Sequence, residues 1–185
     1  MERIVAMENH VTEKAWDMLR NIPDASRREM IAKSRWTCDS HWMMSMVMNA
    51  GWDAANSMNL QVARTVGHVE MQRLMRAINL KKPSNREGFM MMVTMAMETF
   101  ITRDYFDYEF GFTDSGENIG TIHRCYANTK IRDIGAQNDY QCGCFALRAG
   151  WYEAMHVEVK EKLLRSLKDG DDRCEIIIED IIFHQ

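Results

Sequence analysis

Two short segments of the sequence are apolar on almost every side when they are drawn as helices. They are WMMSMVM at residues 42–48 and FMMMVTMAM at residues 89–97, which hold four and five of the chain's 17 methionines. A helix that is apolar all round is typical of a protein core, because it has no polar face to turn to water. We therefore expect two buried helices around which the rest of the chain packs.

The spacing of the apolar residues changes near residue 105. Upstream, apolar residues recur at intervals of three and four, in the series Leu60, Ala63, Gly67, Met71, Leu74 and Ile78. Downstream, aromatic residues alternate with others, in the series Phe106, Tyr108, Phe110 and Phe112. The first period is that of a helix and the second that of a half-buried strand. The first hundred residues are therefore predicted to be helical, and the rest to mix strands with helix.

The downstream region carries the signals of a small antiparallel sheet. Turn residues at 114–118 separate the first strand from a second one, so the two are expected to form a hairpin. One face of the second strand is expected to hold Thr121, His123 and Cys125. Residues 138–156 are predicted to form a helix and residues 174–179 a last strand, while residues 157–168 fit either a strand or a short helix.

Together these elements predict an α+β fold, in which a helical N-terminal half packs on a small antiparallel sheet with a long C-terminal helix. Residues 1–35 are expected to form a helical extension and residues 36–185 the α+β domain. Gly51 lies between two helical patterns and is expected to break the helix. A chain of 185 residues can bury a core without disulfide or metal staples.

Charge and composition argue against several classes of function. The formal net charge is −4, and acidic and basic residues are interspersed, so a nucleic-acid-binding surface is not expected. The sequence has no run of about 18 apolar residues, which a transmembrane helix needs. Its first residues also lack the apolar stretch of a signal peptide. We therefore expect a cytoplasmic protein with neither a membrane nor a nucleic acid as its partner.

The cysteines are Cys38, Cys125, Cys142, Cys144 and Cys174. Their odd number and a cytoplasmic location favour thiols or metal ligands over disulfides. The segment Cys142-Gly143-Cys144 lies where a helix is predicted to start. In a regular helix capped by Asp139, the two thiols point about 200° apart. They can face one site only if the helix begins later, near Phe145.

Three interpretations of these cysteines stay open. In the first, Cys142 is a nucleophile acidified by the helix N-terminus, and His123 is the nearest candidate base. In the second, four thiolates bind zinc or an iron–sulfur cluster, and the ligands are Cys125, Cys142, Cys144 and Cys174. In the third, the cysteines are small core residues or line a pocket.

A pocket for an apolar or aromatic small molecule is predicted between the two methionine-rich helices and the inner face of the sheet. Methionine is polarizable and adaptable, so it suits such a ligand as well as it fills a core. The residues expected to contact the ligand are Trp42, Met46, Met92, Cys125 and Tyr152. Asp39 shares a helical face with Trp42. It is either a buried acid, base or ligand, or a cap or solvent-facing carboxylate.

The stretch CDSHWMMSMVMNAGWDAANSMNLQVARTVGHVEMQRLMRAINL resembles the N-terminal helices of a family of cytosolic proteins from anaerobic archaea and bacteria. That family is allied with the 2-amino-thiazoline-4-carboxylate hydrolase-like proteins. The C-terminal half, HRCYANTKIRDIGAQNDYQCGCFALRAGWYEAM followed by LKDGDDRCEIII, is similar to the same family and to the 4-vinyl reductase small-molecule-binding domain. That domain ends in a helix, a Gly-Asp turn and a cysteine on the last strand, matched here by Gly170, Asp171 and Cys174.

The resemblance implies a small-molecule pocket between helices and sheet. Three functions follow for comparison with the structure. The first is a small-molecule-binding protein with a methionine-rich, cysteine-lined pocket. The second is a hydrolase-like enzyme that depends on a cysteine or a metal in that pocket, and the third is a structural subunit of a complex. Two helices this apolar are hard to cover within one small domain, so we also expect a homodimer.

Overall fold

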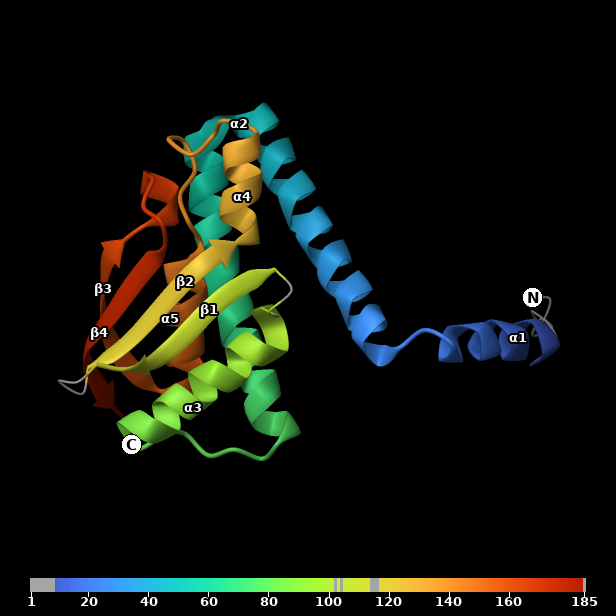
Figure 1. The fold of residues 1–185 in the computed structure, drawn as a ribbon, viewed down its shortest axis with the longest axis horizontal. Coiled ribbons are helices and arrows are strands. Elements are labelled where there is room, and N and C mark those ends of the chain that lie inside the picture. Colours follow the sequence, from blue (N-terminus) through green and yellow to red (C-terminus); the bar gives the residue numbers. More distant parts are fainter. Residues whose placement is uncertain (1–8, 102, 104, 114–116, 185) are drawn as a thin grey trace, which may run out of the picture. The chain divides into compact units, whose positions relative to one another are not determined.

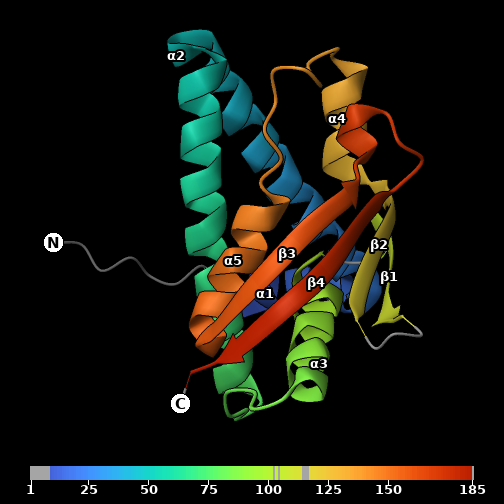
Figure 2. The same ribbon diagram turned by 90° about the vertical axis from the view of Figure 1, so that its left-hand side faces the viewer.

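The computed structural model of the chain describes residues 9–101, 103, 105–113 and 117–184. The chain divides into two compact units, residues 1–42 and residues 43–185, and each is described by itself. Figures 1 and 2 show the ribbon from two directions at right angles.

The first unit is helical. α1 (Asn9–Arg20) ends before Pro23, and α2 (Asp24–Ala77) starts directly after it, as expected from a residue that fits only the first turn of a helix. The carbonyl oxygen of Pro23 accepts a hydrogen bond of 3.1 Å from the Arg27 N–H and so joins the α2 ladder. Large apolar side chains in this unit are exposed, and they are Trp16, Met18, Leu19, Met30, Ile31 and Trp42.

α2 continues into the second unit, where its helical geometry is interrupted at Gly51. The φ of 81° and ψ of 170° at this residue suit glycine, which has no Cβ, and α2 is kinked there (Figure 1). No residue of α2 before Ala55 is buried. After the kink, the predicted stripe does face the core, with Gly67, Met71 and Leu74 buried.

Four antiparallel strands form one sheet in the second unit. They are β1 (Phe106–Phe112), β2 (Asn118–Cys125), β3 (Val157–Arg165) and β4 (Cys174–Phe183). Their order across the sheet is β1-β2-β4-β3. The predicted hairpin of β1 and β2 is confirmed, and β3 resolves the ambiguous segment as a strand.

Helices cover one face of this sheet, as both ribbon views show (Figures 1 and 2). They are the part of α2 after Gly51, α3 (Arg86–Ala96) and α5 (Cys144–Met155). α3 runs into a π-helical turn, η1 (Met97–Ile101), and a 3-10 turn, η2 (Leu167–Asp169), precedes β4. α4 (Tyr126–Asp133) follows β2 directly and has no counterpart in the prediction.

Two glycines let α2 and α5 approach closely. A Cβ on Gly67 would lie 2.0 Å from a carbonyl oxygen of α5, and a Cβ on Gly150 would lie 2.0 Å from a carbonyl oxygen of α2. The Trp151 indole N–H donates a buried hydrogen bond of 3.1 Å to the Glu70 carboxylate on α2. Backbone contact at the two glycines and this bond therefore fix how the two helices cross.

α3 contains the methionine-rich segment that the structure buries. The Asn85 side chain accepts a hydrogen bond of 2.8 Å from the Gly88 N–H and so caps the first turn. The buried side chains of this helix are Phe89, Met90, Met92, Val93 and Ala96. Met91 is 51% exposed. The predicted burial is confirmed for the five buried residues.

The other methionine-rich segment, residues 42–48, is not buried, and the prediction for it is wrong. Trp42 is 53% exposed and Met48 is 76% exposed. Residues 43–47 are half-buried or exposed. A helix that is apolar all round needs cover on every side, and for residues 43–48 the described part of the second unit does not supply it.

The class is α+β, but the predicted arrangement is wrong. The long helix is α2, of 54 residues, in the N-terminal half, whereas α5 has 12 residues. The C-terminal helix starts late because the N–H groups of Asp139 and Tyr140 both donate to the Ala136 carbonyl oxygen and close a turn. It ends early because the chain enters β3 at Val157.

The predicted faces of β2 are corrected by a β-bulge. Residues 107 and 108 of β1 pair with residues 124 and 122 of β2, so His123 is an extra residue in the ladder. Cys125 pairs with the buried Phe106 and turns to the inner side of the sheet, whereas His123 is exposed. His123 and Cys125 therefore do not share a face.

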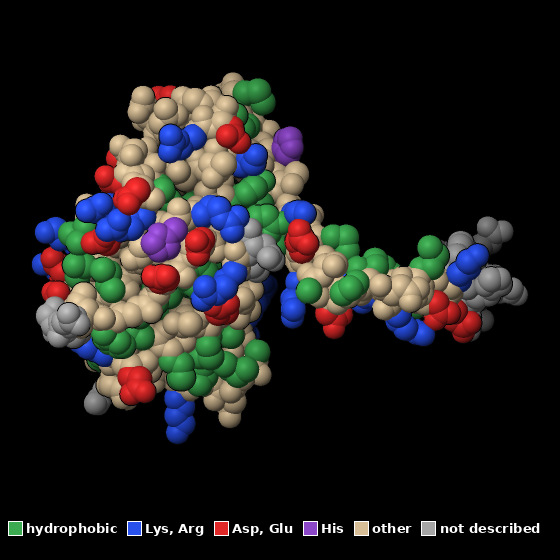
Figure 3. Space-filling model, in the orientation of Figure 1, with side chains coloured by type: hydrophobic (Ala, Val, Ile, Leu, Met, Phe, Trp, Pro, Cys, Tyr) green, Lys and Arg blue, Asp and Glu red, His purple; other side chains and the backbone are tan. Residues whose placement is uncertain are grey.

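The sheet face opposite the helices is polar. Basic and acidic side chains are intermixed on the side of the molecule drawn in Figure 3. Ion pairs on this sheet include Lys160 with Glu179 and Arg173 with Glu175, each at 2.8 Å. Among the described helices, including the long α2, none combines the length and apolar character needed to cross a membrane.

Candidate functional site

One buried asparagine of α2 holds the loop that precedes α5. Asn56 is 2% exposed. Its amide nitrogen donates a hydrogen bond of 2.7 Å to the Asp139 carbonyl oxygen, and its amide oxygen accepts one of 2.9 Å from the Gln141 N–H. The amide of Asn56 thus uses both its donor and its acceptor in hydrogen bonds to the backbone of this loop. The loop is fixed directly before Cys142.

Cys142 and Cys144 lie together because α5 begins at Cys144. Gly143 between them has φ −77° and ψ −3°, and its carbonyl oxygen accepts the hydrogen bond of 2.9 Å from Leu147 that opens the helix. The two thiols lie close enough to interact. The helix expected from Asp139 is therefore corrected, and the later start near Phe145 brings the thiols together.

A buried arginine lies beside Cys144. Arg148 is 6% exposed, and its Nη1 donates a hydrogen bond of 2.8 Å to the Cys144 sulfur. Its Nε and Nη2 donate to the two carboxylate oxygens of Glu161 on β3, at 3.0 and 2.7 Å. The Tyr152 hydroxyl donates to the same carboxylate, and the guanidinium carbon lies 4.5 Å from the centroid of the Phe145 ring.

We call Cys142, Cys144, Arg148, Tyr152 and Glu161 the thiol–arginine centre. The hydrogen bond from Cys142 and the charge of Arg148 hold the pKa of Cys144 below its ordinary value of 9.0, against the effect of burial. The interaction with Cys144 raises the pKa of Cys142. The contact with Arg148 therefore favours Cys144 as the acidified thiol, and the assignment of this role to Cys142 stays a prediction.

This centre is costly to bury. The side chains of Arg148 and Glu161 are 7% and 9% exposed, and a buried ion pair contributes little net stability once its desolvation is counted. Burial raises the pKa of the Tyr152 hydroxyl, which keeps it a neutral donor. Charged groups with shifted pKa values that cluster in this way are typical of functional sites. We therefore take the centre as the candidate site.

Cys125 and Cys174 lie near the centre without joining it. Burial, with a smaller contribution from the Cys144 charge, raises the pKa of both thiols, that of Cys125 to about 12. The Cys174 sulfur accepts a hydrogen bond of 3.4 Å from the Leu167 N–H. Among the residues that the structure describes, no three Cys, His, Asp or Glu side chains are grouped so that they could hold a metal ion. The geometry gives no support to the predicted zinc or iron–sulfur site.

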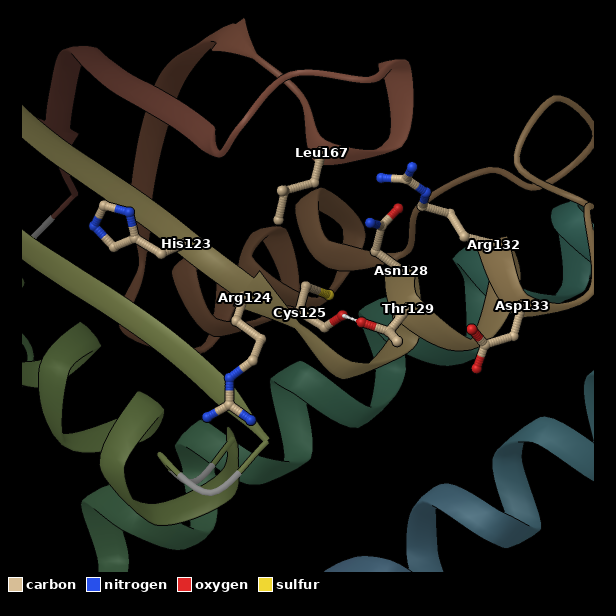
Figure 4. Close-up of a pocket in the computed structure, with 8 residues that line it drawn as sticks. All are labelled: His123, Arg124, Cys125, Asn128, Thr129, Arg132, Asp133 and Leu167. Carbon is tan, nitrogen blue, oxygen red and sulfur yellow. Dashed lines mark hydrogen bonds between the residues drawn. The ribbon is translucent and has the colours of Figure 1, made fainter.

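The predicted base and the predicted acid lie elsewhere. His123 stands 3.8 Å from the Glu109 carboxylate, and Figure 4 shows its ring directed away from the Cys125 thiol. A base must lie within hydrogen-bonding reach of the proton it takes, and for Cys142 the group in reach is Cys144. Asp39 belongs to the first unit, where its side chain is 59% exposed and lies 3.9 Å from Arg35.

The hollows formed by described residues of the second unit include two of about 260 Å³ each. One lies where β2 meets α4 and η2, and Figure 4 shows its lining, which includes His123, Cys125, Asn128, Arg132 and Leu167. The other lies beside α2 and α5, at Arg64, His68 and Glu153. Neither contains the other predicted ligand contacts, Trp42, Met46, Met92 and Tyr152. The predicted apolar pocket is therefore unsupported.

The predicted contacts of the second unit differ in burial. Met92 and Tyr152 are core residues, 1% and 5% exposed, and the Tyr152 ring lies 5.3 Å from that of Phe89. Met46 is half-buried. Sequence reasoning missed Arg148 and Glu161, although Arg148 follows Cys144 by one helical turn and Glu161 follows the period of two in β3.

The fold defines the class of protein: a four-stranded antiparallel sheet in the order β1-β2-β4-β3, covered on one face by helices. The sequence matches no protein-family model, and no curated protein is similar to it in sequence. A solved structure is similar in fold, that of a trafficking protein particle complex subunit 3 from Naegleria fowleri covalently bound to palmitic acid. The two superpose with a TM-score of 0.53 at 12% identity, over 81% of this chain and 95% of the other. At this identity the likeness concerns the fold alone.

Proposed function

We propose that this chain is a subunit of a protein assembly, and that it associates through the apolar surface of α2 beside Gly51. The observation that carries the proposal is the exposure of residues 42–48, which are apolar on almost every side and contain no buried residue. Met48, in the second unit, is 76% exposed. Exposed apolar surface of this kind marks protein interfaces.

Apolar exposure continues on the other side of the kink. Met58 and Val62 of α2 are 38% and 49% exposed. They are four residues apart and so lie on one side of the helix. Exposed apolar side chains therefore occur in α2 both before and after Gly51.

We take the partner to be a second copy of this chain. A segment that is apolar on every side is complementary to itself, and methionine side chains adapt their shape to the opposing surface. Twofold-symmetric homodimers are the commonest closed assemblies. The structural neighbour is named as a subunit of a complex, which supports an assembly role for the fold without identifying the partner.

The test is the mass of the full chain in solution, measured by light scattering over a range of micromolar concentrations. The expected result is a dimer that becomes a monomer in Met48→Glu, because a carboxylate at the interface would be desolvated without a partner. Met91→Glu is the matched control, since Met91 is an exposed methionine of α3. A monomeric mass for the unchanged chain would refute the proposal.

A second candidate function is the binding of a small molecule through the Cys142 thiol. Cys142 is exposed and has a hydrogen-bond partner that can take its proton. The resemblance to the 4-vinyl reductase domain supports a small-molecule ligand, and the covalent palmitic acid of the structural neighbour supports one that is held covalently. The hydrolase-like alternative would use the same thiol as its nucleophile and stays a prediction.

Intact mass of the chain isolated from its own cells tests this second candidate. The expected result is an added mass that hydroxylamine removes, since hydroxylamine cleaves thioesters. The addition should be lost in Cys142→Ser and kept in Cys38→Ser, because Cys38 is an exposed cysteine of the first unit. An unmodified mass, or a modification that maps to Cys38, would set the candidate aside.

A further inference from the structure

Cys142 and Cys144 form a pair in which one residue faces solvent and the other sulfur is held from the protein side. Cys142 is exposed, whereas the Cys144 sulfur receives a hydrogen bond of 2.8 Å from the buried Arg148. The two cysteines are separated only by Gly143, and their thiols lie close enough to interact. Reagents in solution can therefore reach Cys142, and the Cys144 thiol lies next to it.

From this geometry we infer that Cys142 and Cys144 are a reversible two-electron redox site that exchanges with low-molecular-weight disulfides. The inference does not depend on how the chain assembles, because the pair lies at the start of α5 and not on the apolar surface of α2. It also assigns both thiols of the Cys-Gly-Cys segment a role, which neither packing nor a single nucleophile does.

The spacing of the two Cα atoms is compatible with the bond. Gly143 has helix-like dihedral angles, and in a helix two Cα atoms that are two residues apart lie about 5.4 Å from each other. A disulfide accepts Cα separations of about 4.4–6.8 Å. Asn56 holds the preceding loop by hydrogen bonds to the backbone of Asp139 and of Gln141. Cys142 therefore stays within reach of Cys144 without a large movement of the chain.

The reaction balances in two steps. Cys142 attacks one sulfur of a disulfide RSSR, and its S–H bond breaks while a Cys142–SR bond forms. The proton passes through the Cys144 thiolate to the departing RS⁻ and gives RSH. The Cys144 thiolate then attacks the Cys142 sulfur and displaces the second RS⁻, which takes a proton from water. The protein pair loses two electrons and RSSR gains them.

Arg148 is a positioning residue in this scheme. Its guanidinium keeps the Cys144 sulfur at a fixed place, and Glu161 keeps the guanidinium in place through two further hydrogen bonds. Oxidation removes the negative charge from Cys144 and leaves Arg148 with Glu161 alone. The reduced form is therefore favoured by an interaction that the oxidised form lacks, which makes the disulfide labile and the exchange reversible.

The other cysteines near the pair are less suited to this exchange. Cys125 lies on the inner side of the sheet, opposite the buried Phe106. Cys174 is half-buried, and its sulfur is engaged by the Leu167 N–H. Cys38 is exposed but belongs to the first unit, so it provides a control for general thiol oxidation.

The test equilibrates the reduced full chain with mixtures of reduced and oxidised glutathione, stops the exchange with acid and alkylates the free thiols. Trypsin cuts after Arg132 and Arg148 and gives one peptide, residues 133–148, whose only cysteines are the pair. The expected result is that this peptide passes from two labels to none in one two-electron transition, and that reduction restores both labels.

Single variants separate this outcome from its alternatives. Cys142→Ser and Cys144→Ser should each abolish the internal disulfide, whereas Cys38→Ser should leave the transition unchanged. Two labels on the peptide at every glutathione ratio would overturn the inference. So would a peptide that only carries glutathione, or a disulfide that joins either residue to Cys125 or Cys174.

Discussion

Among single residues, Arg148 carries the strongest test of the site. Its removal in Arg148→Met leaves the Glu161 carboxylate buried without its counter-charge, which is costly in a medium of low dielectric constant. The expected loss is about 3–5 kcal/mol in the free energy of unfolding. Urea unfolding followed by circular dichroism measures it.

The matched control is Arg64→Met. Arg64 of α2 pairs with Glu153 of α5. The side chains of this pair are 60% and 41% exposed, unlike those of Arg148 and Glu161. An exposed ion pair is screened by water, so the expected loss is below about 1 kcal/mol. Equal losses in the two variants would mean that the buried ion pair contributes no more to the free energy of unfolding than the exposed one.

The lowered pKa of Cys144 predicts how stability depends on pH. Between that lowered value and the ordinary 9.0, the unfolded chain binds a proton that the folded chain does not, so unfolding becomes harder as pH rises. The contribution is fully present above 9.0 and is lost as pH falls through the lowered value. Cys142, whose pKa is raised, acts in the opposite sense above the ordinary value.

The measurement is the free energy of unfolding of the unchanged chain minus that of Cys144→Ser, from mildly acidic pH to pH near 9. We expect this difference to grow with pH across the window. Cys38→Ser serves as the control, because Cys38 is an exposed cysteine of the first unit and its removal leaves the thiol–arginine centre intact. A difference for Cys144→Ser that does not change with pH would contradict an acidified thiol.

The sequence predicted part of this site at the residue scale. Cys142 and Cys144 were visible as a pair, and the condition for their convergence, a late helix start, followed from helical geometry alone. Which start the chain uses depends on Asn56, 83 positions before its partner Asp139, and no local pattern reveals that contact. Glu161 was equally hidden, because a charged residue in a strand is usually solvated.

At the scale of elements, the crossing of α2 and α5 depends on its two glycines. Gly150→Ala would place a Cβ 2.0 Å from a carbonyl oxygen of α2, so the helices would have to separate. The expected loss is about 1–3 kcal/mol or more in the free energy of unfolding. Gly111→Ala is the control, since a Cβ there meets nothing within 4 Å. Equal stability of Gly150→Ala and the unchanged chain would contradict the close crossing.

Elements with a strong local period were predictable, and elements set by distant contacts were not. The alternation from Phe106 to Phe112 gave β1, and a turn sequence gave the hairpin with β2. α4 follows β2 without a loop and has no buried residue, so it lacks the apolar stripe by which helices are recognised. The bulge at His123 shifted one face of β2, because a period of two fails at an inserted residue.

For the whole molecule, the two methionine-rich segments show what sequence periodicity can and cannot predict. Both are apolar almost all round, yet residues 89–97 lie largely in the core and residues 42–48 do not. The pattern predicts that such a helix needs cover. It does not tell whether the cover comes from the same chain or from a partner, because both bury the same surface.

The most direct test of the proposed interface is amide hydrogen exchange of the full chain at two protein concentrations. One lies below the dissociation constant of the dimer and one lies above it. We predict that residues 43–50 exchange more slowly at the higher concentration, while β1 and β2, which are not part of the proposed interface, are unchanged. The difference should vanish in Met48→Glu and persist in Met91→Glu. Equal exchange of residues 43–50 at both concentrations, with a chain that stays monomeric, would contradict this prediction.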